Sequence, residues 1–475
     1  MTPDTCKSAR YRLTALLLAA VSGVALTASA AFADETQGSQ GIDPALASQL
    51  ASQIEQIKLQ LEALESRPAS SAQFLQDYNS ISIARGSDLD GSFDHLTRRG
   101  DEVPGKRGFT IAISPTADLP APVHEITVSG YVKGDVIYDF DQDLGDSFAF
   151  STASPGKDND HIRLHARQSR FRIRSKSDTS VGQIRTLIEG DFFGASQVFR
   201  MRHAWGEWDM APGWTFGTGQ TWSNFMLLFD LPDTIDFFGP AGLAFSRQGQ
   251  VRLTYNSGPM MLAFAVERPI STLTSVPGLG PVVDSTERVP DFTGRVEYTT
   301  PNNYKVALSG VVGETRLAPH TGFGSALSSD SEIFWGVIGG VQIPVLDWIT
   351  LTASGGFGDG NARYLDGADV ANNVFGLGLG TETISSREFF HIAPSVAVSL
   401  TETVTLNAAW GYIDFDGSDT VAGETDHVQS VHGNVLWQPV PQLKMGVEVM
   451  WAERDIKGVG EVDLVRAQFG TWFFF

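Results

Sequence analysis

From residue 124 to residue 475, apolar and polar side chains alternate in segments of about ten residues. The last segment has mainly apolar side chains at odd positions: Val465, Ala467, Phe469, Thr471, Phe473 and Phe475. Arg466, Gln468 and Gly470 lie between them and would face the other way. A strand that ends on an aromatic residue and exposes one apolar face needs an oily environment on that face. The alternation therefore predicts strands that cross a membrane at a tilt.

The breaks between these segments alternate in length. Tight turns are expected near 178–182, 211–213, 257–258, 301–303, 344–347, 401–403 and 439–441. Generally longer, polar links are expected near 141–160, 193–198, 221–247, 269–289, 314–331, 358–386, 414–427 and 455–460. Short turns on one rim and long loops on the other are typical of outer-membrane barrels, whereas a soluble β-sandwich has no reason for such alternation. We therefore predict an all-β fold, a 16-stranded antiparallel transmembrane β-barrel (a porin) over 124–475.

Aromatic residues near the segment ends fit the two interfacial girdles of such a barrel. Ordinary strand composition would also place aromatic residues there, so the girdle interpretation depends on the barrel prediction. The residues concerned are Tyr138, Trp205, Trp208, Trp214, Tyr255, Tyr298, Trp348, Trp437, Trp451 and Trp472.

The amino-terminal residues 1–33 have the pattern of a secretory signal peptide. Basic residues precede an apolar run that closes on Ala31-Phe32-Ala33, so cleavage is expected before Asp34. No later segment reaches the ~20 apolar residues that a membrane helix requires. Cys6, the only cysteine, would leave with the signal peptide. The barrel is therefore expected to form without disulfides.

Residues 34–66 contain a heptad seam made of Leu50, Ile54, Ile57, Leu61 and Leu64. The 3.5-residue period predicts a short coiled coil, and Ile at both a and d positions favours a trimer. A single amphipathic helix is the alternative. Residues 67–123 are rich in Ser, Gly, Asp and Pro and are interpreted as a linker with one short strand at 109–114.

The formal net charge is −21, and loss of three basic residues and one acidic residue with the signal peptide would make it −23. Such a chain is a poor partner for nucleic acid. It contains neither a GxSxG nor an HExxH motif, and its nine histidines lack metal-ligand spacing. We therefore expect no enzyme activity, no cofactor and no metal.

Basic side chains concentrate on the predicted inner face of the early strands. Arginines facing lipid near the midplane would each cost about 2–4 kcal/mol, so they are expected to face the lumen. Three consecutive strands carry most of them without matching acids, which favours a ladder that binds carboxylate, sulfonate or phosphate groups. A solvated structural face, paired to acids such as Glu189 and Glu297, is the alternative. The predicted pore-lining ladder consists of Arg170, Arg172, Arg174, Lys176, Arg185, Arg200, Arg202, Arg252 and Arg295.

The long link at 221–247 is apolar and aromatic, unlike the other links. Exposed to water it would be an aggregation liability. We expect it to fold into the barrel and narrow the pore, with Asp230, Asp233 and Asp236 facing the basic ladder across a constriction. A lid or a subunit contact is the alternative.

Several stretches resemble the DcaP-like trimeric outer-membrane porins. They are GYVKGDVIYDF (130–140), RQSRFRIRSKS (167–177) and GQTWSNFMLLFDLPDTIDFFGPAG (219–242), together with the export signal and the heptad seam. The resemblance implies a 16-stranded homotrimer in outer-membrane lipid of a Gram-negative cell, a periplasmic coil, and uptake of small anionic solutes such as dicarboxylates.

These observations predict a passive outer-membrane diffusion channel for small hydrophilic, preferentially anionic solutes. A plugged or structural barrel that tethers the envelope through its coil is the main alternative. An outer-membrane hydrolase is a third hypothesis that no motif supports.

Overall fold

The computed structural model describes residues 80–85, 93, 96, 108–114, 124–157, 159–270, 287–317, 320–322, 325–327, 330–367, 374–378, 381–416 and 423–475. The expected signal peptide and coiled coil lie outside these residues. Within them, no helix is long and apolar enough to cross a membrane.

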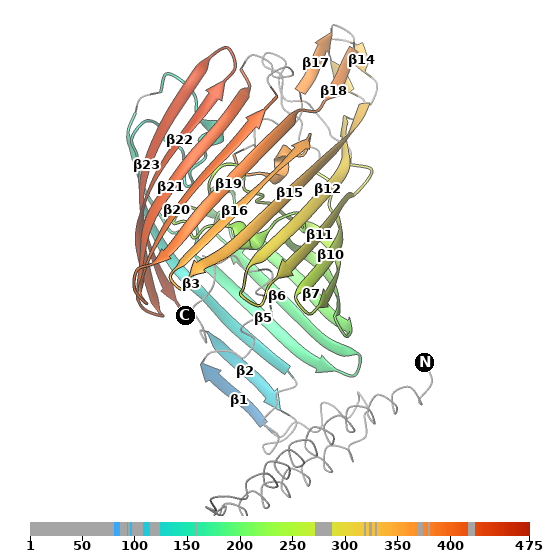
Figure 1. Cartoon of the computed structure of the whole chain (residues 1–475), viewed down its shortest axis with the longest axis vertical. Helices are drawn as coiled ribbons and strands as arrows, with labels where there is room; N and C mark the ends of the chain where they lie inside the picture. The colour runs from blue at the N-terminus through green and yellow to red at the C-terminus, as the bar shows by residue number, and fades with distance from the viewer. Residues whose placement is uncertain are drawn as a thin grey trace, which may run out of the picture. The chain divides into compact units, whose positions relative to one another are not determined.

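A closed antiparallel β-barrel of sixteen strands accounts for most of the described chain (Figure 1). β4 (His161–His165) and β5 (Arg170–Thr179) share one place in the wall, because both pair with β3 (His124–Asp139). The wall continues through β6 (Gly182–Asp191), β7 (Arg200–Ala211), β8 (Trp214–Trp222), β9 (Arg247–Ser257), β10 (Met260–Glu267), β11 (Asp291–Thr299), β12 (Lys305–Leu317), β15 (Asp330–Leu346) and β16 (Ile349–Asp359). It ends with β19 (Glu388–Ser399), β20 (Val404–Phe415), β21 (Thr425–Val440), β22 (Leu443–Ile456) and β23 (Gly460–Phe474).

The barrel closes where the last strand meets the first. β23 pairs with β3 from Arg466 opposite Asp139 to Phe474 opposite Tyr131, so no edge remains at this seam. Below the end of β23, the free edge of β3 is covered by β2 (Phe109–Ser114), which in turn pairs with β1 (Ser80–Arg85). The predicted strand at 109–114 is thus confirmed. β1 was not predicted, since its six residues lie in a stretch without sustained periodicity.

Turn lengths alternate as predicted. Connections of two to five residues join strand pairs such as β5–β6, β7–β8 and β15–β16 on one rim, and mostly longer links join strands on the other. Small hairpins, β13–β14 (His320–Gly322, Ser325–Leu327) and β17–β18 (Val374–Gly378, Thr381–Ser385), lie in two of the long links. Single-turn 3₁₀ segments lie in three others: η3 (Phe150–Thr152), η4 (Ala195–Gln197) and η5 (Leu228–Asp230). A fourth, η6 (Ala362–Tyr364), lies in the same link as β17–β18.

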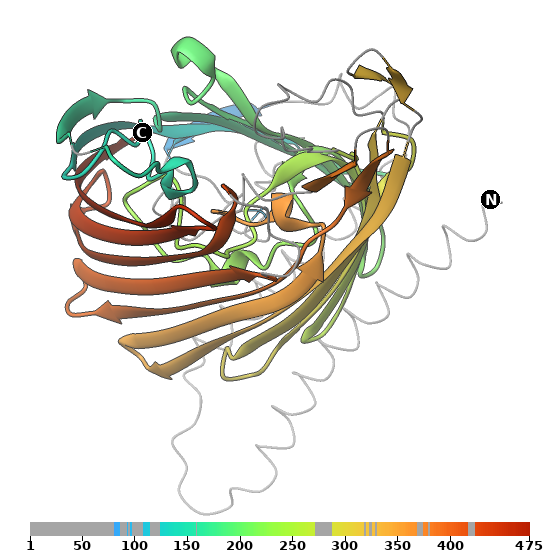
Figure 2. The same cartoon turned by 90° about the horizontal axis from the view of Figure 1, so that it is seen from above.

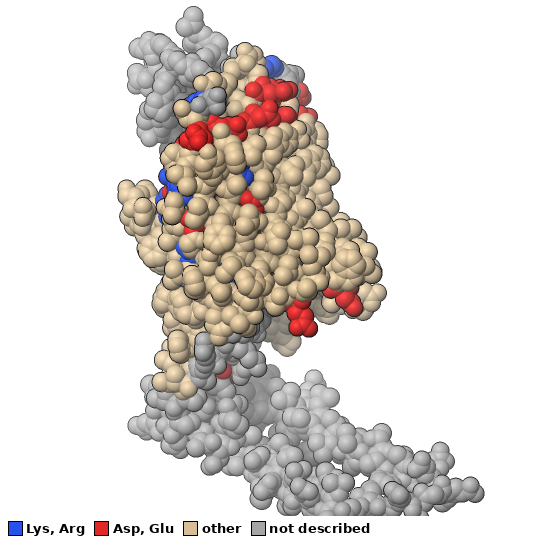
Figure 3. All heavy atoms as spheres, turned by 90° about the vertical axis from the view of Figure 1, so that its left-hand side faces the viewer, with Lys and Arg blue, Asp and Glu red and all other residues tan. Residues whose placement is uncertain are grey.

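The two faces of the wall differ in chemistry as the alternation requires. In β23, Phe469 and Phe473 point outward and are exposed, whereas Arg466 and Gln468 are buried inside. Seen from the side of β20 to β23, the outer surface is a broad zone with few charged atoms, and acidic side chains gather at its upper edge (Figure 3). That zone is suited to contact lipid.

The predicted position in an interfacial girdle is wrong for two residues. Trp205 and Trp472 are 3% and 2% exposed and face the barrel interior. Each lies in register with inward residues of its own strand, Glu207 and Arg466 respectively, so the period of two places it on the inner face. Most of the other aromatic residues named above point outward; Trp208, Trp214, Tyr298, Trp348 and Trp437 are among the exposed hydrophobic side chains.

Candidate pore lining and constriction

The inner faces of β5, β6 and β7 carry the basic residues singled out in the sequence. Arg170, Arg172 and Arg174 alternate with the outward Phe171 and Ile173 and are each less than a tenth exposed. Arg185 on β6, and Arg200 and Arg202 on β7, extend the same cluster around the wall. Lys176 follows at the periplasmic end of β5, half-buried and in register with Arg185.

These arginines have carboxylate partners, which corrects the expectation that matching acids are lacking and agrees with the alternative of a face paired to acids such as Glu189 and Glu297. Glu189 accepts hydrogen bonds from Arg172 Nε at 2.6 Å and Arg202 Nε at 2.8 Å, and it lies 3.8 Å from Arg170 Nη1. Asp191 pairs with both Arg200 and Arg202, at 2.8 and 3.0 Å. The acids lie on the neighbouring strand at registered positions, which strand pairing reveals and strand periodicity alone does not.

A further pair of acids holds Arg185, the arginine of β6. Arg185 Nη2 lies 3.0 Å from Glu207 and 2.8 Å from Asp209, both on β7. Opposite charges on adjacent strands stabilise the barrel wall and keep the net charge of its inner face small.

Arg247, at the start of β9, is a residue that the sequence reasoning missed. Its guanidinium carbon lies 4.5 Å from the ring centre of Trp222, and it forms no hydrogen bond or ion pair with any described residue. Its charge interacts with those of Arg200, Arg202 and Asp191. Arg247 lies at the end of the apolar link at 221–247 and has the opposite parity to Arg252. The alternation of side chains therefore did not predict that it faces the lumen.

Aromatic rings line the same region. Arg202 lies over both Trp222 and Phe237, at 5.6 and 5.7 Å, and Arg200 lies over Phe237 at 5.3 Å. Cations stacked on rings keep their charge with less competing hydration than free side chains. The cluster therefore combines always-charged donors with apolar surfaces.

Arg252 and Arg295 are buried on the inner face but serve a different contact. Arg252 Nη2 donates to the carbonyl of Trp222 at 2.6 Å, and Arg295 Nη1 donates to the carbonyl of Met226 at 2.6 Å. Arg295 also lies 3.3 Å from Glu297. Arg252 and Arg295 therefore anchor the first part of the loop between β8 and β9 instead of extending an open ladder.

The loop between β8 and β9 (residues 223–246) lies inside the barrel and crosses its opening when viewed from above (Figure 2). Its apolar side chains, among them Phe225, Met226 and Ile235, are almost completely buried. It packs with residues of the first long link and of η6 into one apolar cluster. The backbone of Leu243 and Phe245 is hydrogen-bonded to residues 364–366.

The three acids of this loop do not face the arginine ladder, which corrects the expected transverse arrangement. Asp233 binds Lys444 on β22 at 2.9 Å, and Asp236 lies 3.4 Å from Arg466 on β23 and accepts the amide of Phe148 at 3.0 Å. Asp230 is 1% exposed against the wall of β15 and β16. These cations lie on β22 and β23, beside β3 and on the side of the barrel next to the ladder strands, and they pair with two of the acids.

Lys133 reinforces the anchoring of the loop on that wall. Its Nζ donates to the carbonyl of Ile235 at 2.6 Å and lies 2.8 Å from Asp135. Lys133 and Lys444 both lie over the inward ring of Trp472, at 4.5 and 5.0 Å. The alternation of side chains in the sequence places Lys133 on the inner face, but it does not indicate the contact with the carbonyl of Ile235.

Two groups of side chains approach metal-ligand geometry, Asp139 with Asp143 and His161, and Asp426 with His427 and Asp455. Asp139 is already paired with Arg466 at 2.6 Å. Neither group therefore argues for a resident metal.

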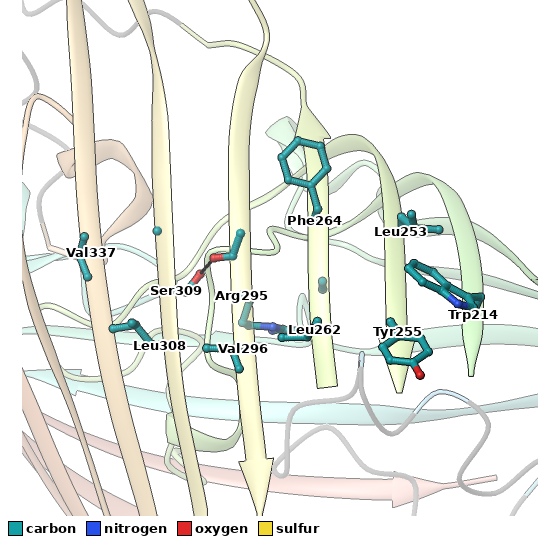
Figure 4. A pocket seen from close by; sticks show the side chains of 13 residues that line it. Trp214, Leu253, Tyr255, Leu262, Phe264, Arg295, Val296, Leu308, Ser309 and Val337 are labelled. Carbon is teal, nitrogen blue, oxygen red and sulfur yellow. Dashed lines mark hydrogen bonds between the residues drawn. The ribbon is translucent and has the colours of Figure 1, made fainter. Parts of the chain in front are cut away.

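An apolar groove of about 570 Å³ lies on the outer wall, across β8 to β15 (Figure 4). Its sides are formed by Trp214, Tyr255 and Phe264, and it faces away from the lumen, so it is no candidate site for a passing solute.

Comparisons with known proteins agree with this architecture. The sequence model of a porin subfamily matches residues 126–471. The chain is similar to the outer membrane channel DcaP of Acinetobacter baumannii, with a TM-score of 0.63, 24% identity, and coverage of 74% of this chain and 97% of that chain. More distant similarity extends to OmpT of Vibrio cholerae (TM-score 0.49, 11% identity, 75% and 99% coverage) and an anion-selective porin from Comamonas acidovorans (0.47, 11%, 74% and 100%). No curated protein sequence matches the chain.

Proposed function

The chain belongs to the porin subfamily and shares its fold with the outer membrane channel DcaP, and from this premise we propose that it is a DcaP-like passive diffusion channel of the outer membrane for small hydrophilic, preferentially anionic solutes. Carboxylate-bearing solutes such as dicarboxylates are the proposed cargo. Sixteen strands enclose a lumen wide enough for water, so the inner side chains set the selectivity. Family membership and fold favour a channel over an enzyme.

The single observation that carries the anion preference is Arg247. Glu189 and Asp191 are already engaged by Arg170, Arg172, Arg200 and Arg202. Arg247 joins this cluster without a carboxylate of its own among the described residues.

A guanidinium stays charged at any physiological pH and presents a planar fork of donors that matches a carboxylate. An entering anion would therefore find an unused partner beside Trp222.

The test is the reversal potential of the purified protein in a planar bilayer under a salt gradient. The wild type should prefer anions, and R247Q should reduce that preference. Arg288, which is 61% exposed beside Glu314, offers a matched control, since R288Q removes the same charge outside the cluster. Cation preference of the wild type would reject the anion claim, and equal effects of R247Q and R288Q would move the filter elsewhere.

We also propose that the barrel assembles as a homotrimer, with residues 34–66 forming a periplasmic coil after removal of residues 1–33. The DcaP-like family character and the heptad seam support this assembly. Mass determination of the detergent-solubilised protein tests it, and a lasting monomer would contradict it.

A sealed barrel is the second candidate function. The apolar cluster that joins the loop at 223–246 with the first long link and with η6 occupies lumen space, which favours a plug. Absence of conductance and of solute-driven liposome swelling would establish this alternative against the channel.

A further inference from the structure

Asp230 differs from the other two acids of the internal loop. Asp233 pairs with Lys444 on β22, and Asp236 pairs with Arg466 on β23. Asp230 has neither an ion pair nor a hydrogen bond to its side chain among the described residues, although it is 1% exposed. The three acids are spaced three residues apart in one loop, so the exception is specific to this position.

The nearest neighbours of Asp230 along the chain are apolar, and no described cation pairs with it. It is the last residue of η5, which packs against β15 and β16, and its neighbours Leu227 and Leu231 are buried. The wall offers the hydroxyl of Ser354 on β16, which interacts with the carboxyl. That hydroxyl is itself buried and, like the carboxylate oxygens of Asp230, has no hydrogen-bond partner among the described residues.

The ionisable groups around η5 do not neutralise a carboxylate. On β11, Glu297 faces Asp230 and adds negative charge, and Arg295 is engaged by Glu297 and the carbonyl of Met226. On β15, the side chain beside η5 is the neutral Gln342, which donates to the carbonyl of Phe229 at 3.1 Å. Lys305 on β12 lies in register with Gln342 and has no contact with Asp230.

The remaining charged residues of the loop are Asp233 and Asp236, which pair with Lys444 and Arg466.

A buried, unpaired carboxylate costs several kcal/mol, so such a group tends to take up a proton. Burial raises the pKa of Asp230, in the loop outside the membrane-crossing strands, to about 7, while Ser354 lowers it and Glu297 raises it. The protonated acid becomes a donor that can satisfy Ser354. A bound cation is less favoured, because the site offers too few oxygens for Na⁺ or Ca²⁺.

We propose that Asp230 and Ser354 form a proton-operated latch that holds the η5 turn against the wall of β15 and β16. The protonated carboxyl donates to Ser354 Oγ and keeps the loop docked. Loss of the proton places a charge in an apolar site beside Glu297, and the turn moves into the lumen to reach water. The latch therefore changes the constriction with pH, independently of which solute passes.

The direction follows from linkage. The docked carboxyl has the higher pKa, so the docked state binds more protons and is favoured in acid. The docking equilibrium falls about tenfold per pH unit between the ordinary carboxyl pKa of 3.8 and about 7, and is constant above.

A nitroxide label at L228C reports the motion of η5 directly by EPR, since Cys6 lies in the predicted signal peptide and L228C would be the only thiol of the mature chain. The label should be immobile at about pH 5 and gain a mobile component at about pH 8, as the linkage requires. D230N mimics the protonated acid and should keep the label immobile at both values. D233N, whose carboxylate is paired with Lys444, is the matched control and should respond as the wild type does.

Three results would overturn the proposal: a label that ignores pH, a D230N variant that still responds, or a D233N variant that loses the response. S354A is the second variant, and it should show the mobile component already in acid because the donor has lost its acceptor. If calcium at about pH 8 immobilised the wild-type label but not D230N, the oxygens would belong to a cation site, and the proton latch would be wrong. None of these readouts depends on ion preference, so the anion claim can fail separately.

Discussion

Replacing Glu189 with glutamine tests whether the arginine cluster is held together by its buried carboxylate. Glu189 is 2% exposed and contacts Arg172, Arg202 and Arg170 within 3.8 Å. The E189Q variant keeps the shape and one acceptor oxygen but removes the negative charge among three cations. Breaking a buried pair in this way costs about 3–5 kcal/mol. Arg202 retains Asp191, so we expect a value near the lower end, about 3 kcal/mol.

The assay is urea unfolding of the refolded protein in detergent, combined with the reversal potential in bilayers. E189Q should lower the unfolding free energy and at the same time increase anion preference, because the lumen gains one net positive charge. D178N removes the same charge at an exposed position near the β5–β6 turn and should change neither. An unchanged unfolding free energy, or a shift toward cations, would refute the reasoning.

Two further substitutions test how the internal loop is seated. A Cβ at Gly411 on β20 would lie 2.0 Å from the carbonyl oxygen of Ala241, so G411A should undock this part of the loop and raise open-channel current noise, whereas G433A, with open space around its Cβ, should not. Equal noise in both variants would contradict the close approach. R466M should lower the unfolding free energy by about 3–5 kcal/mol, because Asp139 would remain buried without its partner at 2.6 Å. A urea midpoint equal to that of the wild type would show that Asp139 finds another donor.

The strands, their number and the alternation of turns and loops could be predicted because lipid and water impose opposite chemistry on the two faces. The same rule placed Arg172 and Arg202 inside. It named Glu189 as their partner only in the alternative interpretation, because that pairing depends on the register between strands, and register is a three-dimensional property. Arg247 was not predicted because it is the first residue of β9, where the period of two does not determine which face a side chain occupies.

The internal loop was recognised from its composition, but its course was not. Apolar residues at 223–246 indicated burial, and burial alone does not say which wall the loop reaches. Lys444 on β22 and Arg466 on β23 bind Asp233 and Asp236, so these two cations, not the ladder, decide the course of the loop. The predicted constriction was therefore wrong because Asp233 and Asp236 pair with Lys444 and Arg466 on the late strands, instead of with the arginines of β5 to β7.

Charge inside this barrel is largely self-compensating, and this makes the exceptions informative. Most inner arginines and acids occur as pairs, which lowers the cost of burying them. Arg247 and Asp230 are described residues that depart from the rule, one cationic and one acidic. A barrel selected for stability alone would pair or remove such residues, since each costs free energy. The two positions are therefore where function is expected to override stability: Arg247 as a partner for the passing anion, and Asp230 as the control of the loop beside it.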